Sequence, residues 1–268
     1  MDGNRPWNQV NVSFPSWDQA ENTAAACIGP QLETDQSVTA WWFIRKSPCW
    51  RIRYQLADPG AKSGVEPYLD ELATAGRIAG WTRAIYEPED CAFGGPEAMA
   101  AAHRLFYADS RAILAYLRDD PGGRHRREIS LMLCSIMLRT ARQDIYEQGD
   151  VWARVAAHRT LPPGRGPDMP TMPDRVRRLI TADAESQMRG GAPLAHCTQW
   201  AAAYTAVGRD LAALATTGRL HRGLRDVLAH HVIFAWNRIG LPYPVQAILA
   251  AAAETAVFGP DPVLTQTG

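Results

Sequence analysis

The hydrophobic pattern of this 268-residue chain changes its period at Gly94-Gly95-Pro96, and this change constrains the fold more than any single motif does. Before it, short runs of alternating apolar and polar residues, rich in β-branched and aromatic side chains, predict the strands of a sheet. After it, apolar residues recur about every 3.6 positions, which predicts helices. We therefore expect an α+β protein with a small N-terminal antiparallel sheet and a mostly helical second half, joined in one compact unit.

The sheet portion, residues 1–93, predicts the order β-α-β-β-α-β, which suits a sheet with helices on one face. The second and third strands are joined by a short turn at Ser47-Pro48-Cys49, which is typical of a hairpin. The first helix should be broken at Gly29-Pro30. Strands are expected at 7–17, 40–46, 50–56 and 79–90, and helices at 18–34 and 64–77.

The helical portion, residues 94–258, begins with one long helix or two abutting ones, for which Pro96 is a suitable first residue. A Pro/Gly-rich stretch at 161–173 predicts a loop, and the tail at 259–268 is expected to be loose. Helices are expected at 96–119, 124–145, 150–160, 174–187, 193–218, 220–240 and 244–258. We expect the two portions to form a single functional domain.

Charge and cysteine usage exclude several classes of protein. With 28 basic and 28 acidic residues the formal net charge is zero, so neither nucleic acid nor an anionic membrane is an expected partner. The five cysteines are odd in number and widely spaced, which predicts free thiols rather than a zinc knuckle or a disulfide framework. No signal peptide and no apolar run of about 20 residues is visible, so a cytoplasmic location is expected.

Polar residues gather in two places of the predicted sheet. Arg45, Arg51 and Arg53 lie on paired strands, so their side chains could meet on one sheet face, or simply form a solvated arginine edge. Tyr86 and Glu87 stand at a strand end, where they form either part of a site or an ordinary acidic turn.

The helical portion adds further candidates. Asp109 and Ser110 are weak helix formers within a helical pattern, so something other than propensity should hold them there. Glu147 lies two positions before Gly149, where it forms part of a site or of an ordinary helix end. In the second case a helix ends at Gly149 and Asp150 caps the next one.

The stretch HHVIFAWNRIGLP at 230–242 carries polar residues on one arc of a predicted helix, opposite an apolar arc that includes Trp236. Adjacent histidines point about 100° apart on a helix and chelate poorly, so no metal site is expected. Geometry alone leaves open whether this polar arc is the wall of a site or faces water. The arc contains His230, His231, Phe234, Asn237 and Arg238.

No dinucleotide fingerprint, phosphate loop, HExxH or GxSxG motif occurs. Four stretches in order nevertheless resemble a known family. They are WWFIRKSPCWRIRYQL (41–56), IYEPEDCAFGGPEAMAAAHRLFYADSRAILAYL (85–117), YEQGDVWARVAAHR (146–159) and HVIFAWNRIGL (231–241). Over about residues 8 to 258 the chain resembles the thiopeptide-type bacteriocin biosynthesis proteins, which are similar to the C-terminal elimination domain of lantibiotic dehydratases.

The resemblance implies an enzyme of ribosomal peptide natural product biosynthesis. We favour a lyase-type pyridine synthase, which joins two dehydroalanines by a formal aza-[4+2] cycloaddition and then loses water and the leader peptide. Tyr107 stands where elimination domains commonly carry histidine, and aromatic residues such as Phe234 and Trp152 suit a nonpolar, azole-rich peptide. Two alternatives remain: a subunit that eliminates glutamate from glutamylated Ser or Thr, and a non-catalytic subunit that binds the precursor.

The resemblance also implies partners and residue roles. The partner is a ribosomal precursor peptide with a leader and a dehydrated, azole-containing core, and other modification enzymes could join it; neither metal nor redox cofactor is needed. The leader could add to a sheet edge at the first strand or the hairpin. The candidate catalytic residues are Tyr86, Glu87, Tyr107, Ser110 and His231. The candidate substrate-binding residues are Arg45, Arg51, Arg53, Asp109, Glu147 (also a possible acid or base), Trp152, Phe234, Asn237 and Arg238.

Overall fold

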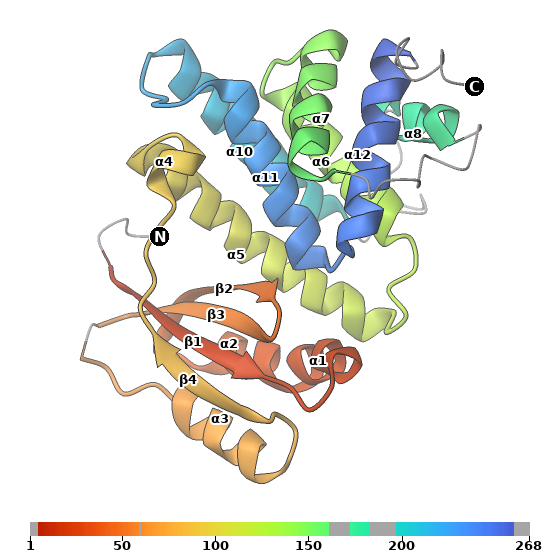
Figure 1. The fold of residues 1–268 in the computed structure, drawn as a ribbon. Helices are drawn as coiled ribbons and strands as arrows, with labels where there is room; N and C mark the ends of the chain where they lie inside the picture. The colour runs from red at the N-terminus through yellow and green to blue at the C-terminus, as the bar shows by residue number, and fades with distance from the viewer. Residues whose placement is uncertain (1–4, 59, 161–171, 183–196, 260–268) are drawn as a thin grey trace. The chain divides into compact units, whose positions relative to one another are not determined.

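The structure, a computed structural model, describes residues 5–58, 60–160, 172–182 and 197–259 (Figure 1). The fold is α+β, with a small antiparallel sheet near the N-terminus and helices in the remainder, as the hydrophobic periods predict. The chain forms two compact units. The first consists of the described parts of 1–88 and 103–124, and the second of those of 89–102 and 125–268. The division falls within one helix, α5 (Pro96–Asp119).

The first unit contains a four-stranded sheet in the order β2-β3-β1-β4. Its elements confirm the predicted order β-α-β-β-α-β. They are β1 (Trp7–Ser13), α1 (Trp17–Thr23), the π-helical segment η1 (Ala24–Ile28), α2 (Gly29–Thr34), β2 (Val38–Lys46), β3 (Cys49–Leu56), α3 (Val65–Thr74) and β4 (Gly80–Ala84). β1 pairs with β3 on one side and with β4 on the other. The first strand is therefore not an edge of the sheet, although it was expected to be available for a peptide.

Helices cover both faces of this sheet, whereas the sequence predicted helices on one face. Helix α3 lies against the face of Tyr54 and Trp81, since the Trp81 indole nitrogen donates to Asp70 at 2.9 Å. The opposite face carries Trp42, whose ring centroid lies 4.7 Å from that of Phe106 on α5. Figure 1 shows α5 as one long helix. The prediction failed because α5 follows the change of period and was assigned to the helical portion alone.

Gly29-Pro30 does not break the first helical region, contrary to prediction. Pro30 is the second residue of α2, and η1 precedes it directly. A π-helical segment shifts the hydrogen-bond register, so the missing N–H of a proline is tolerated there. Glycine at position 29 leaves room for the side chain of Leu114, whose Cδ1 would lie 2.7 Å from a Cβ atom there.

The second unit is a helical assembly in which α6 packs on α10, and α12 packs on both α7 and α8. Residues 129–138 of α6 are all buried, so this helix is enclosed on every side. The predicted loop at 161–173 lies outside the described residues up to position 171, and so does the tail from 260 onward. The helices are α4 (Asp90–Phe93), the start of α5, α6 (Arg126–Thr140), α7 (Ile145–His158), α8 (Met172–Thr181), α10 (Thr198–Thr216), α11 (Leu224–Ile239) and α12 (Tyr243–Phe258).

Gly149 lies inside α7 and does not end a helix, so the alternative with Asp150 as a cap is wrong. The N-cap is Asp144, whose carboxylate accepts from the backbone of Glu147, while the Glu147 side chain accepts from the backbone N–H of Asp144. This capping box places the N-cap at Asp144, six residues before Asp150, the cap of the rejected alternative. Gly149 instead permits close packing, since a Cβ atom there would meet Phe258 at 2.6 Å.

Candidate functional site

The first unit holds a cluster of aromatic rings around a buried arginine, here called the Arg53 cluster: Trp7, Trp42, Arg53, Tyr86 and His103. The Arg53 guanidinium lies over the rings of Trp42, at 4.2 Å, and Tyr86, at 4.4 Å. Its Nε donates a hydrogen bond to Oε1 of Gln9 at 2.7 Å. A guanidinium held between two aromatic faces is stabilised by cation–π attraction and keeps both rings in place.

The chemically active pair of this cluster is Tyr86 and His103. The Tyr86 hydroxyl lies 2.8 Å from Nε2 of His103. Burial, and secondarily the positive charge of Arg53, lower the pKa of His103 to about 4. At neutral pH the imidazole is therefore uncharged, with one ring nitrogen that accepts a proton and one that donates. The tautomer of the imidazole decides which of the two groups donates in this hydrogen bond.

His103 was not among the residues predicted from the sequence. Its helix is rich in alanine, and a single histidine on such a helix has no local signal of function. The available hint was its position one helical turn before Tyr107 in the FYADSR motif. The contact with Tyr86 depends on the packing of α5 against the sheet, which no local pattern reveals.

A groove of about 690 Å³ opens beside the Arg53 cluster. Its wall includes Trp7 and Tyr86, and it runs past Arg83 and Glu66, which are linked by a hydrogen bond of 2.7 Å from Arg83 Nε. Burial, together with the charge of Glu66, raises the pKa of Tyr54 in the same wall to about 12, so its hydroxyl stays protonated. A volume of this size suits a small molecule or a short peptide segment.

The three arginines predicted to gather on one face do not do so. In the strand register Arg45 stands opposite Trp50, whereas Arg53 stands opposite Trp42, and successive side chains on a strand point to opposite faces. Arg45 forms an ion pair with Glu21 and lies over the Trp50 ring at 4.6 Å. Arg51 and Arg53 share the other face. The spacing of the sequence could not reveal the register, which the hairpin turn sets.

The other predicted residues of the first unit lie along α5 or next to Tyr86. Glu87 is exposed. The Tyr107 hydroxyl accepts a hydrogen bond from Arg111 at 3.3 Å. Asp109 and Ser110 are both buried, and the Ser110 hydroxyl accepts the backbone N–H of Phe43 at 3.2 Å. Ser110 thus satisfies a donor of β2 that would otherwise be buried without a partner, which explains a weak helix former at this position.

In the second unit, the polar arc of α11 does not face water. His231 and Arg238 are fully buried, and Phe234 is 9% exposed. Phe93 packs edge-on against His231 and Phe234, with ring centroids 4.9 and 5.0 Å away. Burial, and then the charges of Arg238 and His230, lower the pKa of His231 to about 3, so this imidazole is neutral. The solvent-facing alternative is therefore wrong for His231 and Arg238.

The remaining predicted residues of this unit are held by packing and polar contacts. Each partner comes from another part of the unit, so these side chains are fixed in position. The contacts are a hydrogen bond of 3.0 Å from Gln246 to Asn237, a stack of Trp152 on Trp236 at 6.0 Å, and an ion pair of 2.7 Å between Arg225 and Glu147.

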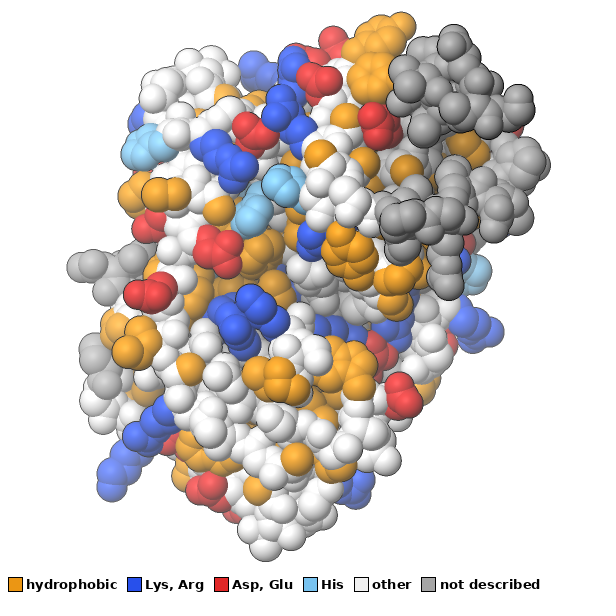
Figure 2. Space-filling model, in the orientation of Figure 1, with side chains coloured by type: hydrophobic (Ala, Val, Ile, Leu, Met, Phe, Trp, Pro, Cys, Tyr) orange, Lys and Arg blue, Asp and Glu red, His pale blue; other side chains and the backbone are white. Residues whose placement is uncertain are grey.

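The surface shown in Figure 2 carries Lys and Arg side chains interspersed with Asp and Glu. In the part of the chain that the structure describes, no three His, Cys, Asp or Glu side chains lie together in a way that could hold a metal ion. No described helix combines the length and the apolar character that crossing a membrane would require.

Comparison with known proteins connects this geometry to a family. The profile described as the C-terminal part of lantibiotic biosynthesis dehydratases matches residues 7–257. No curated protein sequence matches the chain.

Solved structures share the fold, among them MibB, TsrL and TbtD. The tRNA-dependent lantibiotic dehydratase MibB from Microbispora sp. 107891 has a TM-score of 0.60 and 17% identity; the match covers 100% of this chain and only 29% of MibB. TsrL has a TM-score of 0.61 and 16% identity, with 96% of this chain and 99% of TsrL covered. The pyridine synthase TbtD from thiomuracin biosynthesis has a TM-score of 0.59 and 14% identity, with 94% and 97% covered.

Proposed function

Because the chain belongs to the family of the lantibiotic biosynthesis dehydratase C-terminal domain, we propose that it is a pyridine synthase acting on a ribosomally made peptide. It joins two dehydroalanine residues into the nitrogen-containing ring of a thiopeptide. The observation that carries the proposal is the Tyr86–His103 pair, a hydroxyl and a neutral imidazole 2.8 Å apart, with Tyr86 in the wall of a groove.

The reaction begins with a proton shift in one dehydroalanine. Its amide nitrogen loses a proton and the carbonyl oxygen of the same amide, which belongs to the preceding residue, gains one, which gives a 2-azadiene. In our proposal the Tyr86 hydroxyl protonates this oxygen, and the neutral imidazole of His103 returns a proton to Tyr86. The proton that leaves the amide nitrogen restores the imidazole, so the tautomerisation has no net gain or loss of protons. The two terminal carbons of the azadiene then form two C–C bonds with the alkene carbons of the second dehydroalanine, and the diene nitrogen becomes the ring nitrogen. Loss of water, and then of the leader peptide as its amide, leaves the aromatic pyridine.

Orientation supplies the rest of the acceleration. Two alkenes held in reacting geometry gain the equivalent of about 7 to 11 kcal/mol. Trp7, Ile85 and Tyr86 provide apolar surface in the groove, and Ile85 is 89% exposed and available for contact. The Arg53 guanidinium lies over the Tyr86 ring, 4.4 Å from its centroid, and in our proposal it acts as a positioning residue. The roles proposed for His231, Phe234 and the other residues of α11 remain predictions.

The test supplies the protein with two synthetic precursors, one that bears dehydroalanines and one that bears glutamylated serine. Pyridine absorbance with release of the leader is the expected result. Release of glutamate from the second precursor would instead identify an eliminating enzyme, and conversion of neither would favour a peptide-binding subunit.

Variants test the proton pair. Tyr86→Phe and His103→Gln should lower kcat by about 100-fold or more, the usual worth of a general acid or base. Tyr146→Phe is the matched control, because Tyr146 is 67% exposed on α7. Full activity of Tyr86→Phe would show that another group moves the proton.

A further inference from the structure

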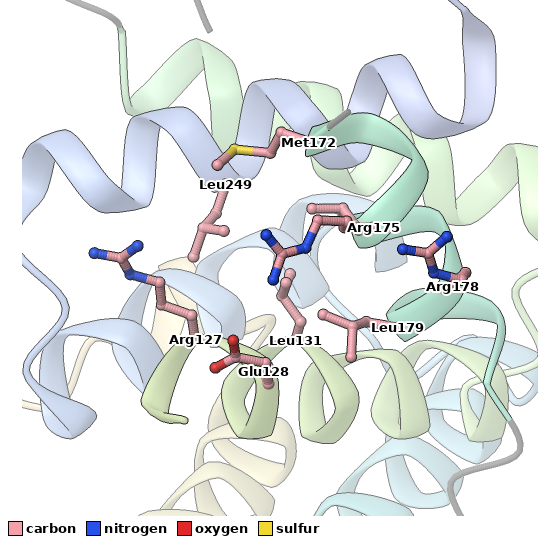
Figure 3. A pocket seen from close by; sticks show the side chains of 9 residues that line it. Arg127, Glu128, Leu131, Met172, Arg175, Arg178, Leu179 and Leu249 are labelled. Carbon is pink, nitrogen blue, oxygen red and sulfur yellow. The ribbon is translucent and has the colours of Figure 1, made fainter. Parts of the chain in front are cut away.

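A second pocket lies in the helical unit, between α6, α8 and α12 (Figure 3). It encloses about 270 Å³. In Figure 3 the side chain of Arg127 comes from α6, that of Arg175 from α8 and that of Leu249 from α12. We call it the arginine pocket. Its lining residues are Arg127, Glu128, Leu131, Met172, Arg175, Val176, Arg178, Leu179 and Leu249.

The pocket carries an excess of positive charge that the described residues do not neutralise. The lining contains three guanidinium groups, those of Arg127, Arg175 and Arg178, and one carboxylate, that of Glu128. In residues 5–58, 60–160, 172–182 and 197–259, none of these three guanidinium groups has a hydrogen-bond or ion-pair partner. Other surface arginines of the unit do have partners, as Arg225 does with Glu147 and Asp150. With respect to the described residues, the three cations of the pocket are therefore available to a negatively charged ligand.

The floor of the pocket is apolar and its volume is small. Leu131, Val176 and Leu249 are at most 4% exposed, so they form a fixed surface beneath the exposed arginines. A volume of about 270 Å³ falls just below the roughly 300 to 1,000 Å³ typical of small-molecule sites. The space suits one or two side chains of a larger ligand better than a whole cofactor.

We propose that the arginine pocket binds a peptide segment in which a carboxylate side chain stands beside an aliphatic one. Planar guanidinium groups bind carboxylates through paired hydrogen bonds, and the floor receives the aliphatic group. The proposed function supports only the choice of a peptide as the ligand, because a peptide-modifying enzyme meets its substrate in more than one place.

A membrane surface is the less suitable occupant. Helix α8 is basic and amphipathic, as many membrane-binding helices are. Its apolar residues Val176 and Ile180 are already buried, and α8 packs against α6 and α12. The apolar face that would have to enter the lipid is thus occupied.

The test measures binding of a fluorescein-labelled synthetic peptide of alternating Glu and Leu by anisotropy. The double variant Arg175→Gln/Arg178→Gln should bind about tenfold more weakly, since each exposed charge pair contributes up to about fivefold. Arg177→Gln is the matched control. Arg177 lies on the same helix and is exposed, but it does not line the pocket. The affinity of this variant for the peptide should therefore change less than about twofold.

Three results would refute the proposal that the arginine pocket binds an acidic peptide. They are absence of binding, equal binding of a peptide of alternating Gln and Leu, and an equal loss of affinity in Arg177→Gln and in the double variant. Preferential binding to phosphatidylglycerol vesicles would do the same. The assay needs no turnover, so its outcome is separate from that of the proposed function: a chain that forms pyridine but ignores the probe refutes the pocket alone.

Discussion

Two buried histidines should make the protein lose stability as the pH falls from about 7.5 to about 5. In the folded state the pKa of His103 is lowered to about 4 and that of His231 to about 3, mainly by burial. In the unfolded chain both should titrate near 6.5. Below that value the unfolded state binds more protons than the folded state, so acid favours unfolding.

The pKa values set the size of the effect. At pH 5 an unfolded histidine is almost fully protonated, while both folded histidines remain mostly neutral. Each residue then costs about 1.4 kcal/mol for each of the roughly 1.5 pH units between 6.5 and 5, or about 2 kcal/mol. Together they remove about 4 kcal/mol from the free energy of unfolding. Carboxyl groups that are stabilised in the fold, such as Glu66, contribute mainly below this range.

Urea denaturation followed by the fluorescence of the nine tryptophans measures this difference at the two pH values. His103→Gln should lose about half of the pH dependence, whereas a variant of the exposed His158, His158→Gln, should keep it. If the free energy of unfolding of the wild-type protein falls by less than about 1 kcal/mol between the two pH values, the inference that burial keeps these histidines neutral is refuted. An unchanged pH dependence in His103→Gln would refute it for that residue.

Three further substitutions test packing and capping. Ser110→Ala removes the acceptor of the buried Phe43 N–H and should cost about 1 to 3 kcal/mol in chemical denaturation; if Ser110 acts in chemistry as well, kcat of the folded fraction will also fall. Asp144→Ala removes the N-cap of α7 and should cost about 1 kcal/mol, read from the shift in urea midpoint. Gly149→Ala places a Cβ atom 2.6 Å from Phe258 and should lower Tm in calorimetry; an unchanged Tm would mean that α7 and α12 part easily at this point.

The sheet half was largely predictable because its signals are local. Alternation along a strand depends on neighbouring residues only, and the strands expected at 40–46 and 50–56 correspond to β2 (Val38–Lys46) and β3 (Cys49–Leu56). Short turns between such runs fixed the element order. The change of period at Gly94-Gly95-Pro96 likewise separated strands from helices.

The errors of prediction have tertiary causes. The position of β1 between β3 and β4 depends on which strands pair, and strand pairing joins residues far apart in the sequence. Gly29 and Gly149 looked like helix ends, whereas both are places where another segment comes too close for a side chain. The sequence alone does not distinguish a glycine needed for its backbone freedom from one needed for its small size.

For the candidate site, the sequence by itself determined the chemical inventory and, through four ordered motifs, the family. It supplied Tyr86 and Arg53 as candidates but not their partner His103, and it grouped Arg45 with the wrong face. Only the tertiary structure brought the hydroxyl, the imidazole and the guanidinium together, because they come from three separate segments whose register and packing are set by long-range contacts. Burial decided the rest: the same fold that excludes water from His103 and His231 keeps both imidazoles neutral, and no local pattern in the sequence encodes that exclusion.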